Sequence, residues 1–260
     1  MKIRSLLLFA ALLSLWESAA YGSGEKNTLE PGAWAQKSFV YVAEKFGIPI
    51  LRASIRIANG LSEGGRDLYR VQASVNSLNH LGFLFRMNNR FTSTMESETC
   101  VPVRYVKEID QEGLLVPNKR YLQEIIFDFP NKRVIVENGG GKARQEIPLP
   151  PDTYDPLSMF ARCYLKEELH PGQDIRMSIY DGVKLRQMVF QSRRERMKSR
   201  IYGAVEVLRL ESSTSFSAFG DKEGVIRIWY TADGKKIPVL MELDLPVGSV
   251  KFELEKVEES

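Results

Sequence analysis

The sequence predicts a mainly β fold, in which a strongly curved antiparallel sheet or half-open barrel holds one α-helix. The composition is that of a globular protein, since 43% of the 260 residues are hydrophobic and 27% are charged. This balance argues against a disordered, collagen-like or coiled-coil chain. About a dozen short runs have strand-like character and are separated by turn residues, whereas only one segment carries a full set of helix signals.

The first twenty residues have the three-part layout of a secretory signal peptide. Lys2 and Arg4 give a basic start, Leu6–Leu15 is almost wholly apolar, and small residues follow. Cleavage is predicted after Ala20, or alternatively after Gly22. The apolar run is about half of the ~20 residues that a membrane-spanning helix needs, and no other run is long enough. We therefore predict export to the periplasm and no transmembrane segment in the mature chain.

Residues 21–34 are polar and are predicted to be a loose N-terminal segment. Residues 35–258 are predicted to form a single β-rich domain, because the chain has no internal repeat and no shift in composition. Strand-like patterns cover the first half of this domain. The strands predicted there are Ser38–Glu44, Leu51–Ala58, Asp67–Val75, Arg90–Met95, Val101–Ile109, Tyr121–Phe129 and Arg133–Glu137.

The helix is predicted at about residues 156–168. Asp155 is suited to cap its N-terminus, and Pro156 fits the first helical position. Apolar residues then recur at the i, i+3, i+4 spacing of a buried helical face, and His170-Pro171-Gly172 ends the pattern. Upstream, the proline-rich run at 147–151 excludes a helix interior or a central strand.

The last third returns to strand patterns with short connections. The strands predicted there are Asp174–Tyr180, Lys184–Arg194, Ala204–Glu211, Val225–Tyr230, Lys236–Leu245 and Ser249–Val257. Asp-Gly pairs at 181–182 and 233–234 suit tight hairpins. Short links between neighbouring strands imply antiparallel pairing. So many strands in one sheet must curl or close to protect their edges.

Cys100 and Cys163 are the only cysteines. An oxidising compartment permits a disulfide between them, which would stabilise the fold by roughly 4 kcal/mol on the chain-entropy model. The alternative is two buried free thiols, because Cys163 lies on the apolar face of the predicted helix. No cysteine precedes Cys100, so none lies where a bacterial lipid anchor would be attached.

The sequence contains no pattern that predicts a catalytic, cofactor or metal site. A zinc site needs three or four clustered ligands, and His80 and His170 are the only histidines. The glycine-rich run at 138–142 does not match a phosphate-binding loop and is read as a hairpin turn. Ser158 lacks the glycines of a nucleophile elbow. We therefore expect no enzyme, with an unrecognised hydrolase-type activity as the lesser alternative.

The densest basic run is a candidate contact for anionic envelope material such as lipid headgroups or acidic polysaccharide. Its cations are Arg193, Arg194, Arg196, Lys198 and Arg200. The alternative is a solvated strand end, because alternation along a strand would divide these cations between two faces.

A dense apolar segment around Gly82 is the candidate lining of an apolar pocket. Its candidate lining residues are Leu81, Phe83, Leu84 and Phe85. Core packing is the default interpretation of such a run, but bent sheets can also enclose ligand cavities.

Several segments, in their order and spacing over about residues 35 to 257, resemble one known family. They include Phe39-Val40-Tyr41-Val42, Arg86-Met87-Asn88-Asn89-Arg90, Asp155-Pro156-Leu157-Ser158, Tyr180-Asp181-Gly182 and Ile228-Trp229-Tyr230-Thr231. The chain is similar to the bacterial exported family catalogued as domain of unknown function 3108. The resemblance implies an envelope protein with a β-rich, barrel-like fold. It brings no catalytic or binding residues and lends no support to the disulfide.

Two functions remain open from the sequence. The first is a non-catalytic periplasmic protein that binds an apolar or lipid-like envelope ligand in its curved sheet. The second is a structural or assembly factor that contacts envelope proteins or acidic polymers. Export and the small formal charge of +3 argue against nucleic acid as a partner.

Overall fold

The computed structural model describes residues 36–45, 48–114, 116, 118–139, 144–216, 222–245 and 248–259. The predicted signal peptide at 1–20 and the predicted loose segment at 21–34 lie outside these residues. In the described residues, fifteen strands form one sheet. They are β1 (Gln36–Lys45), β2 (Ile48–Glu63), β3 (Arg66–Ser77), β4 (Phe85–Glu96), β5 (Pro102–Gly113), β6 (Lys119–Asp128), β7 (Arg133–Asn138), β8 (Arg144–Pro148), β9 (Thr153–Tyr154), β10 (Asp174–Tyr180), β11 (Leu185–Ser199), β12 (Gly203–Phe216), β13 (Lys222–Thr231), β14 (Pro238–Leu245) and β15 (Gly248–Glu259).

The strand order follows the chain in two runs that meet in the middle of the sheet. One run goes from β8 back to β1, the other from β15 back to β9, and β1 pairs with β15 where they join. Neighbouring strands are antiparallel except β9 and β10, which are parallel. Each strand predicted from the sequence overlaps one of these strands, and the predicted antiparallel pairing is confirmed.

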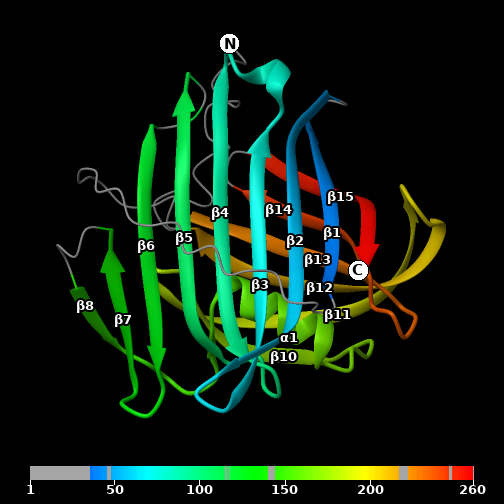
Figure 1. Cartoon of the computed structure of the whole chain (residues 1–260). Coiled ribbons are helices and arrows are strands. Elements are labelled where there is room, and N and C mark those ends of the chain that lie inside the picture. The colour runs from blue at the N-terminus through cyan, green and yellow to red at the C-terminus, as the bar shows by residue number, and fades with distance from the viewer. Residues whose placement is uncertain are drawn as a thin grey trace.

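The sheet bends so strongly that its two halves face each other (Figure 1). We call β2–β6 the front wall and β10–β15 the back wall. The two edge strands, β8 and β9, are joined by only the short link 149–152. This link is held on both sides, because the Leu149 amide donates to the Lys132 carbonyl and the Ser178 amide donates to the Asp152 carbonyl. The result is a curved, non-closed, β-barrel-like sheet, as predicted.

The helix α1 (Pro156–Leu165) lies between the walls at one end of the sheet (Figure 1). Asp155 caps it as predicted, accepting from the Leu157 and Ser158 amides at 2.8 and 3.0 Å. The buried Ser93 hydroxyl, from β4, donates to the other carboxylate oxygen at 2.6 Å. Burial raises the pKa of Asp155. One side chain therefore both starts the helix and ties it to the front wall.

The helix is three residues shorter than predicted. The Lys166 and Glu167 amides both donate to the Arg162 carbonyl, so the regular hydrogen-bond ladder stops there. The Glu167 carbonyl accepts from the Lys236 ammonium at 2.7 Å, and its carboxylate accepts from Arg162. These tertiary contacts hold the chain in a non-helical path after Leu165.

Aromatic side chains fill the space between α1 and the sheet. Phe39 of β1 meets Tyr164 edge-on, with ring centroids 5.3 Å apart. Phe160 packs against Tyr230 of β13, with centroids 6.4 Å apart. Such pairs add about 0.5–1.5 kcal/mol each beyond their buried area. The helix thus closes one end of the sheet with an aromatic core.

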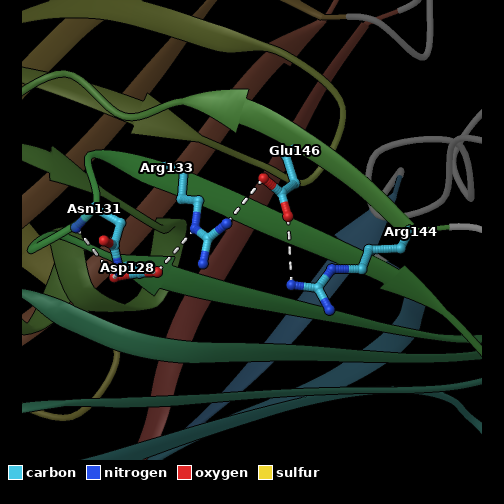
Figure 2. A network of polar contacts seen from close by, with 5 residues as sticks. All are labelled: Asp128, Asn131, Arg133, Arg144 and Glu146. Carbon is cyan, nitrogen blue, oxygen red and sulfur yellow. Dashed lines mark hydrogen bonds and ion pairs between the residues drawn. The ribbon is translucent and has the colours of Figure 1, made fainter.

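Two strands were not predicted from the sequence. β8 is an edge strand that ends at Pro148, which is where a sheet tolerates proline. Charged side chains hold it to its neighbours: Figure 2 shows Arg133 bonded to Asp128 and Glu146, with Arg144 on the second Glu146 oxygen. The Arg133 guanidinium holds the pKa of Asp128 below its usual value. β9 has only two residues, too few for a period-2 pattern.

We expect Asp155→Ala to lower the free energy of unfolding by about 3 kcal/mol, because it removes the cap and leaves the buried Ser93 hydroxyl without its acceptor. Urea unfolding measures the change. Asp174→Ala, an exposed carboxylate at the start of β10, is the control and should change stability by less than about 0.5 kcal/mol. Equal stability of both variants would contradict the role of this cap.

Candidate functional site

The inner face of the sheet is defined by the side chains that share the side of α1. Tyr230 contacts the helix, so alternation in β13 puts Ile228 and Ile226 on the same side. Pairing extends this side across the back wall, since Ile228 lies opposite Met241 and Ile226 opposite Leu243. This face is the natural candidate for a binding surface.

Cover over this inner face decreases with distance from the helix. Phe39, Tyr41 and Tyr230, near α1, are fully buried. Further along the back wall, half-buried apolar side chains lie in the next rows of the inner face. They are Ile226, Met241, Leu243 and Phe252. The helix therefore fills one end of the curved sheet, and the back wall keeps partly exposed apolar surface beyond it.

Exposed apolar side chains mark the opposite end, which we call the open end. Phe83, Leu114 and Ile48 are 76%, 74% and 56% exposed. Backbone hydrogen bonds join their segments, from the Leu114 amide to the Leu84 carbonyl and from the Leu78 amide to the Ile50 carbonyl. Along β4, this end lies about 26 Å from Ser93 at the helix cap. We call Ile48, Phe83 and Leu114 the apolar rim.

The candidate lining residues of the sequence analysis lie at this open end. Phe85 belongs to β4 and is buried in the core, whereas Phe83 points into solvent. Leu81 ends the short 3₁₀ helix η2 (Asn79–Leu81), and Leu84 follows it; both are half-buried and pack against the core. The structure thus brings the four residues together, and their contact with a ligand stays a prediction.

A buried lysine on the inner face of the front wall was missed by the sequence reasoning. Lys107 of β5 is only 5% exposed and pairs with Phe91 on β4 and Gln123 on β6. The sequence contains a sign of it in the alternation of β5. Lys107 takes the inward position between Tyr105 and Ile109, where an apolar residue is expected. Burying an ammonium is costly unless it is paired.

The Lys107 ammonium donates to the Asp181 main-chain carbonyl at 3.0 Å. Among the described residues no carboxylate lies within ion-pair distance of it. Burial lowers the pKa of Lys107 to about 8, opposed by the nearby Asp181 and reinforced by the neighbouring cation of Lys119. The inner face therefore carries a desolvated cation.

Buried amides lie on the same inner face as Lys107. Asn89 donates to the Gln111 carbonyl oxygen at 3.1 Å, and Gln123 donates to Asn138 at 3.1 Å. The side-chain oxygen of Gln123 is buried and accepts no hydrogen bond in the described structure. Buried polar groups are normally satisfied. A cluster that keeps unused hydrogen-bonding capacity on an inner face is a candidate for ligand contact.

The turn between β10 and β11 covers this cluster from the back wall. Gly182 has φ +91, and a Cβ on it would lie 2.4 Å from the Gln123 side-chain oxygen. The Asp181 carboxylate is held by the Arg186 guanidinium at 2.8 Å. Only glycine allows the turn to approach the front wall so closely.

The basic run predicted to contact anionic material lies on the β11–β12 hairpin, and its five side chains are exposed. Arg194 and Arg196 both pair with Glu206 on β12. Arg200, at the tip, pairs with Glu44 of β1 at 2.6 Å and with Glu253 of β15 at 3.4 Å. Three of the five cations thus have internal partners, and contact of the run with an anionic surface stays a prediction.

Arg200 ties the hairpin tip to two strands that are distant in sequence. We expect Arg200→Gln to reduce the free energy of unfolding by about 0.5–1 kcal/mol, the range of exposed ion pairs. A double-mutant cycle with Glu44→Gln should give a coupling energy of the same sign. Arg193→Gln, on β11 of the same hairpin, is the control and should leave stability unchanged. A coupling energy of zero would contradict the tether.

Both cysteines are buried free thiols in the structure. Cys100 precedes β5 and Cys163 lies in α1. Burial raises the pKa of Cys100 to about 11 and that of Cys163 to about 12. At neutral pH both are protonated and poor nucleophiles.

We expect neither thiol to react with iodoacetamide in the native protein at pH 7.5, and both to react after denaturation without a reductant. Mass spectrometry of the intact protein counts the added groups. A denatured protein that takes up the label only after reduction would instead establish the disulfide left open by the sequence.

Within the described ranges, no three His, Cys, Asp or Glu side chains are grouped so that they could hold a metal ion. The same residues include no helix with the length and apolar character needed to span a membrane.

The fold and this inner face define a β-barrel-like protein with a curved, non-closed sheet. A similar solved structure is described as a beta-barrel-like protein of domain of unknown function DUF1849 from Brucella abortus. Its TM-score is 0.53 at 10% sequence identity, covering 87% of this chain and 98% of that chain. At this identity the likeness shows the fold alone.

The sequence matches the family described as Protein of unknown function (DUF3108) over residues 38–255, and the chain belongs to this family. The resemblance drawn from the sequence is therefore confirmed. Curated proteins include no match to the chain.

Proposed function

We propose that this protein is an exported, periplasmic protein without catalytic activity, which binds an apolar or lipid-like ligand on the inner face of its curved sheet. One observation supports this most directly. Half-buried apolar side chains of the back wall lie between the aromatic core around α1 and the exposed apolar rim. Apolar surface that is left partly uncovered inside a curved sheet is typical of ligand sites.

The spacing of this surface suits an acyl chain. Two adjacent rows of the inner face offer four half-buried apolar residues, which are Ile226 with Leu243 and Met241 with Phe252. Burying one methylene group stabilises a complex by about 0.8 kcal/mol. An acyl chain of about 15 methylene groups would therefore contribute about 12 kcal/mol, which covers micromolar binding after an association cost of about 4 kcal/mol.

The apolar rim supplies the entry route in this proposal. Phe83, Leu114 and Ile48 lie at the open end. A ligand that leaves a membrane or a carrier protein would enter the sheet there. Exposed apolar groups lower the barrier for an acyl chain to enter, because part of the chain stays out of water during transfer.

Export rests on residues 1–20. We expect the full chain, expressed in a Gram-negative host, to be found in the periplasmic fraction with its N-terminus cut after Ala20 or Gly22. N-terminal sequencing of that fraction gives the site. Recovery of an uncut chain in the cytoplasm would overturn the location.

Ligand binding is tested with a soluble lysophospholipid and isothermal titration calorimetry. We expect Leu243→Gln to weaken binding about tenfold, because it replaces an inner apolar side chain by a polar amide. Leu122→Gln makes the same change on an exposed leucine of β6 and should leave the affinity unchanged. Native mass spectrometry of the purified protein shows whether a lipid is retained. Absence of binding in wild-type protein would overturn the proposal.

The second candidate is a structural or assembly factor, and one observation favours it. Ile201 and Tyr202, at the tip of the β11–β12 hairpin, are 37% and 48% exposed next to the cations of the basic run. Aromatic and cationic side chains together are typical of protein interfaces. Cross-linking from a reactive group at position 202 to one defined envelope protein would support this role.

A further inference from the structure

The inner face of the front wall carries charge where the back wall carries apolar surface. Lys107 is buried, and Lys119 pairs in register with Gln111, four residues further along β5, so it stands on the same face. The two ammonium groups are close enough for Lys119 to depress the pKa of Lys107. The inner face thus combines apolar rows on the back wall with cationic and amide side chains on the front wall.

Lys107 is the unusual member of this patch. Its ammonium donates to a neutral carbonyl, and its other two N–H groups have no acceptor among the described residues. Asp181 is the nearby counter-charge, but its carboxylate forms no ion pair with Lys107, and an ammonium taken out of water without an ion pair destabilises the fold. A neutral residue of similar length would avoid the cost. The charge is therefore better explained by a ligand than by stability.

The amides beside Lys107 extend the same chemistry. Asn89 and Gln123 are buried and neutral, and each donates one amide N–H, to Gln111 and to Asn138, and has a second N–H on the same nitrogen. A buried ammonium stabilises carboxylate or phosphate oxygens by charge-assisted hydrogen bonds. No such arrangement is needed for an uncharged hydrocarbon.

We propose that the ligand is an amphiphile with an acidic headgroup, whose carboxylate or phosphate binds at Lys107 while its acyl chain lies on the apolar rows of the back wall. This inference rests on the proposed function and specifies the chemical class of the ligand. Lys119 is the second cation that the headgroup meets, nearer to the open end.

The experiment compares two single-chain lipids that share one acyl chain, the anionic lysophosphatidylglycerol and an uncharged monoacylglycerol without phosphate, by isothermal titration calorimetry on the full mature protein. We expect wild-type protein to bind the anionic lipid about tenfold more tightly, the effect of one charge-assisted hydrogen bond. Lys107→Met keeps the length of the side chain and removes its charge, and should bind both lipids equally. Lys119→Gln should reduce the preference by a smaller factor.

Lys198→Met is the matched control, because it removes the same charge from an exposed position on β11. It should keep the wild-type preference. If Lys107 is only a structural tether for the Asp181 turn, Lys107→Met should weaken the binding of both lipids by the same factor. The tenfold preference would then be kept, and this result overturns the inference. Headgroup preference is measured on wild-type protein as well, so the test stands even where Lys107→Met fails to fold.

The outcomes separate the two proposals. Equal binding of both lipids by wild-type protein overturns the headgroup inference and leaves the proposed function in place. Binding of neither lipid overturns the proposed function itself. Inorganic phosphate provides the third arm: displacement of the anionic lipid by phosphate at micromolar concentration overturns the amphiphile assignment in favour of free phosphate.

Discussion

The pairing of β1 with β15 is the contact on which the architecture depends. Each half of the chain forms a run of neighbouring antiparallel strands, and only this pair joins the two runs into one sheet. Contacts of long sequence separation reinforce the join, since the Tyr41 hydroxyl donates to the Pro238 carbonyl and Arg52 pairs with Glu255. The segment between β1 and β15 runs from residue 46 to residue 247, and bringing its two ends together costs conformational entropy. The continuous ladder of backbone hydrogen bonds between β1 and β15 offsets this cost.

This join also places the two walls and the helix. Because β1 and β15 lie in the middle of the sheet, the walls can fold toward each other on either side of them. The edges then approach through the link 149–152, and α1 follows directly after β9 into the space between the walls. Helix α1 thus fills one end of the sheet because its connection to β9 lies there, and the other end is left with the apolar rim.

The inner face combines features that a purely structural core would avoid. Tyr230 and Phe160 pack densely near the helix, whereas Lys107 on the front wall is buried without an ion pair. Proteins tolerate such conflicts where a site requires them. The contrast between the apolar back wall and the polar front wall is the basis for assigning this face to a ligand.

The sequence by itself determined the local structure. Alternation of apolar and polar side chains located the strands, and Asp155-Pro156 located the start of the helix, because these signals act within a few residues. It also supplied the segments that place the chain in its family. The end of the helix, the edge strand β8 and the partners of Arg200 were not predictable, since residues far away in sequence decide them.

Tertiary structure alone decided which side of each strand became the inside of a curved sheet. Alternation divides β5 into two faces, but it does not say that the face of Lys107 is covered by the Asp181 turn from the opposite wall. That covering turns an ordinary lysine into a desolvated cation. The candidate site emerged only in three dimensions, because the burial of Lys107 and its lack of an ion pair are properties of the folded chain.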